Sequence, residues 1–226
     1  RGGYVECTHF GAIAVVNARG KVLAQAGDAD FVTFTRSTLK AFQALPFVEA
    51  GGVQRFGFST PEVAMLCASH NGEAKHVAAV ESMLEKSGNS YQRLRCGCGI
   101  PGVYSLMDKS PPEGLQFDER HHNCSGKHAG FVAHCIGQGW SVEDYTDPAH
   151  PLQQAVAKDV ARAVGMDVRE MKMGIDGCSA PNFAMPLSKL AYGYARLASG
   201  ARDAEFGTSF AILGEAMSTH PDMVSG

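Results

Sequence analysis

The segment HHNCSGKHAGF, residues 121–131, holds three histidines, a cysteine and a lysine. Imidazoles and thiolates bind transition metals, and zinc takes them in tetrahedral sites. Cys124, Lys127 and His128 of this segment could therefore form a metal site with Cys178 of GIDGCSAPNF. The spacing is not diagnostic, because no C-x-x-C pair occurs in the sequence. Two free, buried cysteines remain the alternative interpretation.

A serine nucleophile is the second candidate, because the stretch RSTLK contains S-x-x-K at Ser37 and Lys40. Residues i and i+3 share a helix face, so the amine can lie one turn from the hydroxyl. A buried lysine has a lowered pKa and can accept the serine's proton, and a helix N-terminus stabilises a developing oxyanion. The pattern is short enough to occur by chance. A helix-capping serine beside a surface lysine is the alternative.

The stretch CASHNGE supplies Ser69, His70 and Asn71. S-x-N is the second element of the acylation sites of penicillin-recognising enzymes. In those sites the serine relays protons and the amide orients the substrate. The third element, K-T-G, is absent from the 226 residues. The alternative is that Ser69 or Asn71 only caps the helix that follows.

Asp176 is the remaining candidate, since it lies in a glycine-containing loop beside Cys178. Gly174 and Gly177 allow the backbone to approach a ligand closely, and no basic residue stands beside Asp176 in the sequence. A carboxylate in a loop after a strand is well placed for a site. The alternative is that Asp176 accepts hydrogen bonds from the backbone N–H groups of its own loop.

The elements that must position these residues are predicted from spacing and turn signals. Residues 11–27 contain two β-prone runs around NARG and predict a hairpin. Ser37 is predicted to cap a helix over residues 38–45, and Asn123 or Ser125 to cap one over 127–139. Further predictions are helices over 72–88, 150–165 and 203–220, a loop over 91–114, and a short strand, a Gly/Pro loop and a helix over 170–200. A hairpin followed by helices favours an α+β fold.

The composition is that of a globular protein, and residues 1–226 are predicted to form a single domain. Hydrophobic residues make up 45% and charged residues 19% of the chain. The net charge of −3 argues against nucleic acid as a partner, and no apolar run reaches transmembrane length. Seven cysteines without regular spacing favour a reducing compartment, so we expect a cytoplasmic location. The chain begins in strand-like sequence and stops on a glycine, so we expect it to be part of a longer protein.

Five segments in order resemble one family across essentially the whole chain. They are RGGYVECTHFGAIAVV, RSTLKAFQALP, CASHNGE, NCSGKHAGF and GIDGCSAPNFAMPLSKLA. Together they look like the rhizobial-type (class 3) L-asparaginases, or asparaginase II proteins. The resemblance implies a fold similar to serine β-lactamases and glutaminases, with an antiparallel sheet flanked by helices. It also implies hydrolysis of L-asparagine to L-aspartate and ammonia, and we expect a homodimer.

The resemblance implies roles for six residues. Its catalytic residues are Ser37, Lys40 and Ser69, and its zinc ligands are Cys124, Lys127 and Cys178. We add three substrate-binding candidates from the residues themselves: His70, Asn71 and Asp176, the last for the substrate ammonium. In that family the lysine partner of Ser69 and the C-terminal strands lie past Gly226. The segment alone is therefore expected to lack part of the fold and to be inactive.

Three readings remain open at this point. The first is an amidohydrolase that acts on L-asparagine through a serine ester. The second is a penicillin-binding or β-lactamase-like serine acyltransferase, which the missing K-T-G disfavours. The third is a non-catalytic zinc-binding module with the same fold. The sequence leaves open which serine attacks and whether zinc is catalytic or structural.

Overall fold

The computed structural model describes residues 2–226, and its centre is a three-stranded antiparallel sheet. The sheet has the order β3-β5-β4, formed by β3 (Val32–Phe34), β5 (Pro181–Pro186) and β4 (Lys172–Ile175). β5 is the middle strand, and all its residues except Pro186 are buried. Phe34 of β3 pairs with Ala184, and Ile175 of β4 pairs with Pro181.

This topology brings two segments that are distant in sequence to the same end of the sheet. Because β3 and β4 are both antiparallel to β5, they run in the same direction, and their C-terminal ends point toward the same end of the sheet. The 3-10 helix η1 (Arg36–Leu39), which contains Ser37, follows β3. The loop that contains Asp176 and Cys178 follows β4. The sheet therefore brings the serine and the cysteine candidates together.

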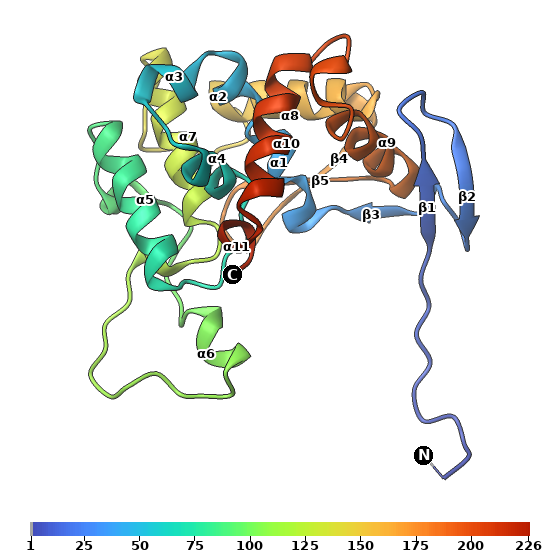
Figure 1. Ribbon diagram of the computed structural model, residues 1–226, viewed down its shortest axis with the longest axis horizontal. Helices are drawn as coiled ribbons and strands as arrows, with labels where there is room; N and C mark the ends of the chain where they lie inside the picture. Colours follow the sequence, from blue (N-terminus) through green and yellow to red (C-terminus); the bar gives the residue numbers. More distant parts are fainter. Residues whose placement is uncertain (1) are drawn as a thin grey trace.

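A separate two-stranded hairpin precedes the sheet, as the sequence predicts. β1 (Ile13–Val16) pairs antiparallel with β2 (Val22–Ala26), and Ile13 lies opposite Ala26. The Asn17 side chain accepts hydrogen bonds from the backbone N–H groups of Arg19 and Lys21, which fixes the turn. Figure 1 shows this hairpin beside α9 (Leu187–Leu197), at the side of the molecule.

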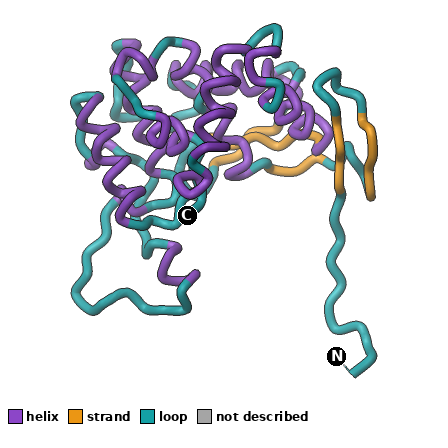
Figure 2. The backbone as a smooth tube through the Cα atoms, in the orientation of Figure 1, coloured by secondary structure: helices purple, strands orange, loops and turns teal. Residues whose placement is uncertain are grey.

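Helices gather over one face of the three-stranded sheet (Figures 1 and 2). The remaining helices are α1 (Lys40–Gln43), α2 (Leu45–Glu49), α3 (Gly52–Phe56), α4 (Thr60–Leu66), α5 (Ala74–Lys86), η2 (Tyr91–Arg93), α6 (Gly102–Leu106), η3 (Glu119–His121), α7 (Ser125–Gln138), α8 (Pro151–Val164), η4 (Val168–Glu170), η5 (Gly200–Arg202), α10 (Gly207–Thr219) and α11 (Pro221–Val224). The helices predicted over 72–88, 127–139, 150–165 and 203–220 correspond to α5, α7, α8 and α10. No helix within residues 2–226 combines the length and apolar character that a membrane crossing requires.

α7 is buried over most of its length, and it packs directly on α4. Residues 125–135 of α7 are all buried. A Cβ atom added at Gly126 would lie 2.3 Å from the carbonyl oxygen of Met65, so only glycine permits this approach. The contact fixes the start of α7, where the metal candidates Cys124 and Lys127 lie.

Four local predictions need correction, although the α+β class is confirmed. The stretch after β4 was expected to be a Gly/Pro loop but contains β5, which is buried on both faces and so shows no polar alternation. Thr35, not Ser37, precedes the first helical turn, and Ser37 lies inside η1. Cys124, rather than Asn123 or Ser125, is the N-cap of α7. The loop predicted over 91–114 also contains the short helix α6.

Candidate functional site

The two candidate serines meet, although they lie on different elements. Ser37 Oγ donates a hydrogen bond to Ser69 Oγ at 3.2 Å. Ser37 belongs to η1, and Ser69 follows α4. The backbone N–H of Ser69 donates to the Val224 carbonyl oxygen at 2.9 Å, which holds the residue after α4 in place. Both serines are half-buried, so a hydroxyl pair is available at the edge of the core.

Lys40 is buried beside this pair, with its side chain 2% exposed. Its Nζ donates to the carbonyl oxygens of Ala68 at 2.5 Å and Asn123 at 3.2 Å. Burial lowers the pKa of Lys40, because desolvation penalises the ammonium; the nearby Cys124 thiolate opposes that effect. Within residues 2–226 no hydrogen bond joins Lys40 to Ser37, contrary to the geometry expected from S-x-x-K. The amine lies instead against the backbone that leads into Ser69.

The predicted metal candidates form a cluster of sulfurs and amines. Lys127 Nζ donates to Cys178 Sγ at 3.1 Å. A hydrogen bond from Cys178, together with the charges of Lys127 and Lys40, lowers the pKa of Cys124 to about 5. Burial acts in the opposite sense at Cys135: desolvation, with a smaller contribution from the Asp144 charge, raises the pKa of this thiol to about 12. Cys124 is thus a thiolate at neutral pH, and all seven cysteines are free.

Within the described part of the chain, no group of three His, Cys, Asp or Glu side chains is placed to hold a metal ion. The donors that do gather are two sulfurs and one amine, from Cys124, Cys178 and Lys127. A thiolate already stabilised before a metal arrives is the chemistry that zinc selects. The donor set therefore fits zinc only if the lysine serves as a neutral ligand.

His128, a neighbour of Cys178 and Lys127, forms a hydrogen bond with Tyr145, a residue that no sequence motif singled out. The Tyr145 hydroxyl accepts a hydrogen bond from the Arg95 backbone N–H at 2.8 Å and pairs with His128 Nδ1 at 2.7 Å. Burial lowers the pKa of His128 to about 4, so the ring is neutral at pH 7. The pair anchors α7 to the segment before α8.

Asp176 has a basic partner, which the sequence did not predict. Arg36 Nη2 lies 2.8 Å from Asp176 Oδ1, and the same oxygen accepts the Gly177 backbone N–H at 2.8 Å. The Arg36 side chain is 68% exposed and the Asp176 side chain 11%. Asp176 thus accepts a hydrogen bond from the backbone of its own loop, as the alternative interpretation predicts, and it also forms an ion pair with Arg36. The only signal for Arg36 in the sequence is its position directly before Ser37.

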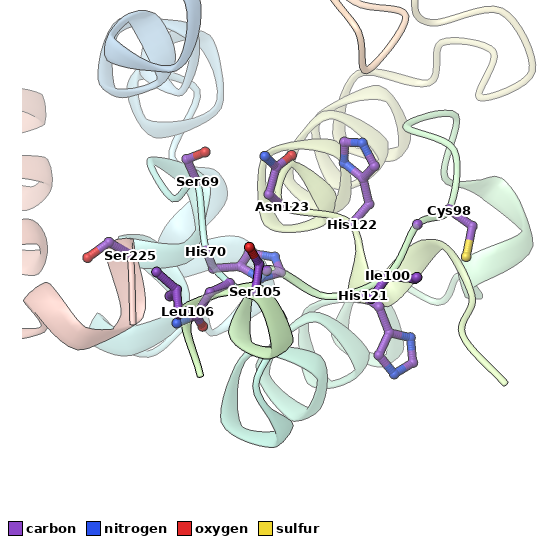
Figure 3. Close-up of a pocket in the computed structure, with 13 residues that line it drawn as sticks. Ser69, His70, Cys98, Ile100, Ser105, Leu106, His121, His122, Asn123 and Ser225 are labelled. Carbon is purple, nitrogen blue, oxygen red and sulfur yellow. The ribbon is translucent and has the colours of Figure 1, made fainter. Parts of the chain in front are cut away.

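A cavity of about 560 Å³ opens beside Ser69, and Asn71, His122 and Asn123 also line it. Figure 3 shows Ser69 and Asn123 reaching this space from different segments. Asn71 Oδ1 is buried and accepts a hydrogen bond from no described residue. An unpaired buried carbonyl is costly, so Asn71 offers an acceptor that a substrate N–H group can satisfy.

His70 also borders the cavity, but its ring is already engaged. The side chain is 1% exposed. Its Nδ1 accepts the Gly72 backbone N–H at 3.1 Å, so its Nε2 carries the proton and donates to Ser125 Oγ at 2.9 Å. Burial lowers the pKa of His70 to about 3. Contact between His70 and the substrate stays a prediction. The two hydrogen bonds of the ring favour a role for His70 in fixing the loop that carries Ser69 and Asn71.

Comparison with known proteins gives one clear result. A family model described as L-asparaginase II matches residues 1–226, which include every candidate residue discussed above. No curated protein matches the chain.

Proposed function

The chain belongs to the L-asparaginase II family, and from that premise we propose a mechanism in which Ser37 forms an ester with the substrate. Membership makes the protein an asparaginase, an amidohydrolase whose substrate is a small molecule. Hydrolysis of L-asparagine to L-aspartate and ammonia requires a nucleophile, a base and a group that recognises a zwitterion. The residues described above supply a candidate for each.

The observation that carries the proposal is the hydrogen bond between Ser37 and Ser69 beside a buried lysine. Ser37 Oγ attacks the carboxamide carbon and forms a C–O bond. Its proton passes through the Ser69 hydroxyl to the neutral amine of Lys40. The Lys40 ammonium then protonates the leaving nitrogen, the C–N bond breaks, and ammonia departs. Water hydrolyses the ester and restores the Ser37 hydroxyl.

The lowered pKa of Lys40 supports its role as the base. A lysine in water stays protonated near neutral pH and cannot accept a proton. Burial increases the neutral fraction of Lys40 and so makes it a competent acceptor. The carbonyl oxygens of Ala68 and Asn123 orient the amine between the two segments.

The Arg36–Asp176 pair fits recognition of an amino acid. L-Asparagine carries an α-ammonium and an α-carboxylate, and these two charges complement Asp176 and Arg36 respectively. The substrate exchanges one ion pair, whose arginine is 68% exposed, for two charge-assisted contacts. Asn71 Oδ1 can accept a hydrogen bond from the substrate's side-chain amide. We assign His70 the role of positioning Asn71, the next residue in the chain.

We further propose that Cys124, Lys127 and Cys178 hold zinc. The low pKa of Cys124 and the contact between Lys127 and Cys178 support this assignment. Lys127 must lose its proton to ligate, and a divalent cation favours that loss. When bound, zinc would supply a positive charge that polarises or orients an oxygen of the substrate. The relation to serine β-lactamases and glutaminases, the homodimer and the cytoplasmic location remain further parts of the proposal.

Two assays of the full-length protein test the proposed function: ammonia release from L-asparagine and L-glutamine, and ring opening of a β-lactam followed by absorbance. Release from L-asparagine that the Ser37→Ala variant loses supports it. Turnover of the β-lactam without turnover of L-asparagine favours the serine acyltransferase. Stoichiometric zinc with no turnover of any substrate favours the non-catalytic module.

A further inference from the structure

The backbone of Arg36 adopts a conformation that L-residues rarely take. Its φ is +51°, in the left-handed region. Arg36 is one of three non-glycine residues between 2 and 226 with a positive φ, and it directly precedes Ser37. Such a conformation persists only where the surroundings hold it, and it recurs at functional sites. The direction in which η1 starts, and with it the position of Ser37, depends on this residue.

The side chain of Asn182 holds Arg36 at both of its backbone polar groups. Asn182 Oδ1 accepts the Arg36 N–H at 3.1 Å, and Asn182 Nδ2 donates to the Arg36 carbonyl oxygen at 3.1 Å. Asn182 is 3% exposed, so water does not compete for these bonds. Within residues 2–226 no other side chain forms hydrogen bonds with both groups. The amide of asparagine can do so because it offers a donor and an acceptor side by side.

Asn182 extends the sheet at the point where strand pairing stops. Thr35 still pairs with β5, since its N–H donates to the Phe183 carbonyl oxygen at 3.1 Å and its hydroxyl to the same oxygen at 2.9 Å. At Arg36 the chain turns away from the sheet, and the Asn182 side chain replaces the backbone as its partner. The backbone of Asn182 pairs with Gly174 of β4, next to the loop of Asp176. One residue of β5 thus ties the serine segment to the loop of the substrate candidates.

We propose that Asn182 is a positioning residue for Ser37. Its amide holds Arg36 in the left-handed conformation, and this directs Ser37 Oγ at Ser69 Oγ. The same contact places the Arg36 guanidinium over Asp176. The catalytic consequence rests on the proposed function, in which Ser37 is the nucleophile, whereas the geometric part does not.

Gln43 provides a matched control for a purely structural role. It is a buried amide, 2% exposed, and its Nε2 donates to the Pro181 carbonyl oxygen of the same strand at 3.2 Å. In the described part of the chain, its side chain forms no hydrogen bond with Arg36. If Asn182 only stabilised the fold, Asn182→Ala and Gln43→Ala would lower thermal stability and activity to similar extents.

Steady-state kinetics with L-asparagine compare these variants. We expect Asn182→Ala to lower kcat by about 100-fold, because small displacements of a reacting group cost that much. Asn182→Asp keeps the acceptor but loses the donor, so its kcat should lie between those of Asn182→Ala and the parent. Gln43→Ala should retain kcat within about threefold at a matched loss of melting temperature. Equal losses of kcat in Asn182→Ala and Gln43→Ala would overturn the proposal.

A crystal structure of the Asn182→Ala protein tests the geometric part independently of activity. We expect the φ of Arg36 to leave the left-handed region and the hydrogen bond between Ser37 and Ser69 to break. Persistence of both features would overturn the proposal even if activity falls. If the features are lost while Ser37→Ala still turns over asparagine, the positioning of Ser37 stands and the assignment of Ser37 as nucleophile fails.

Discussion

At the scale of single residues, the site depends on burial that changes the protonation of amines and thiols. Lys40 and Cys124 lie within one cluster, and their pKa values are both lowered. The causes differ: desolvation disfavours the Lys40 ammonium, whereas a hydrogen bond and nearby amines favour the Cys124 thiolate. A neutral amine beside a thiolate is the state that both the proposed base and the proposed metal site require.

Replacement of Lys40 by Met removes the proposed base and keeps an unbranched side chain of similar length. We expect Lys40→Met to lower the rate of ammonia release from L-asparagine by at least about 10³-fold, within the range that general acid–base catalysis contributes. Circular dichroism should show an unchanged fold, because a methionine fills the space and removes a buried amine. Near-normal turnover in this variant would refute the role of Lys40.

The proposed base also sets the pH dependence of catalysis. Lys40 must be neutral to accept a proton, so kcat/KM should rise with pH and level off above the pKa of Lys40. Because burial lowers that pKa, the midpoint of the rise should lie below the usual lysine value of 10.5. Initial rates across a pH series measure it. A rise centred at or above 10.5 would contradict the assignment.

Asp176 is expected to act mainly on substrate affinity. Asp176→Asn removes the charge that pairs with the substrate ammonium, so KM for L-asparagine should rise by at least about tenfold. Asp167→Asn is a matched control, because Asp167 is also paired with an arginine, Arg169, at 2.6 Å, but at the start of η4. If Asp176→Asn lowers the melting temperature and leaves KM unchanged, Asp176 is only a loop cap.

At the scale of elements, α7 and β5 position the site. α7 carries Lys127 and packs against α4 through Gly126, where a Cβ atom would meet the Met65 carbonyl oxygen. β5 pairs with both β3 and β4, so it determines the relative positions of the segments that carry Ser37 and Cys178. Helix packing and strand pairing therefore decide which functional groups meet.

Gly126→Ala tests the close packing of α7 on α4. We expect a loss of about 1–3 kcal/mol in the free energy of unfolding, because the added methyl group forces the two helices apart. Gly137→Ala in the same helix is the control, since its Cβ would meet the Phe56 ring at 3.5 Å and Arg55 Nη1 at 3.7 Å, both ordinary van der Waals distances. That change should be neutral or stabilising by up to about 1 kcal/mol. Urea denaturation measures both, and equal effects would contradict the packing argument.

The sequence predicted helices more successfully than the middle strand of the sheet. α5 and α8 show the periodic apolar spacing of amphipathic helices, and Pro151 marks the start of α8 as expected. β5 was not predicted for two reasons. All but its last residue are buried, so the strand lacks an alternation of polar and apolar residues, and it begins and ends with proline. Its pairing with β3 joins residues far apart in sequence, and local patterns do not report that contact.

The candidate site was predictable in residue type but not in contact pattern. The short motifs singled out Ser37, Ser69 and Cys178, and the structure brings these segments together. The Arg36–Asp176 pair and the contacts of Asn182 with Arg36 arise only from the pairing of β3 with β5. Such contacts depend on the tertiary structure, so no spacing rule could have given them.

At the scale of the whole molecule, buried neutral histidines couple folding to acid. Burial lowers the pKa of His70 to about 3, and those of His128 and His134 to about 4. Between these values and 6.5, the unfolded chain binds more protons than the folded protein. The free energy of unfolding should therefore fall as pH decreases through this window.

His134 isolates this effect, because desolvation is the one cause of its lowered pKa. In the His134→Gln variant the loss of unfolding free energy between pH 7.5 and pH 4 should be smaller by about 3 kcal/mol. Urea denaturation at both pH values gives the difference. An identical loss in parent and variant would show that His134 does not carry this linkage.

The central claim is that Ser37 carries the substrate as an ester during turnover. The most direct measurement is peptide mass spectrometry of the protein after rapid acid quenching during hydrolysis of L-asparagine. We predict an aspartyl adduct on the peptide that contains Ser37, absent from the Ser37→Ala variant and present, at lower yield, in Ser69→Ala. An adduct on Ser69 that persists in Ser37→Ala, with ammonia still released, would contradict the account.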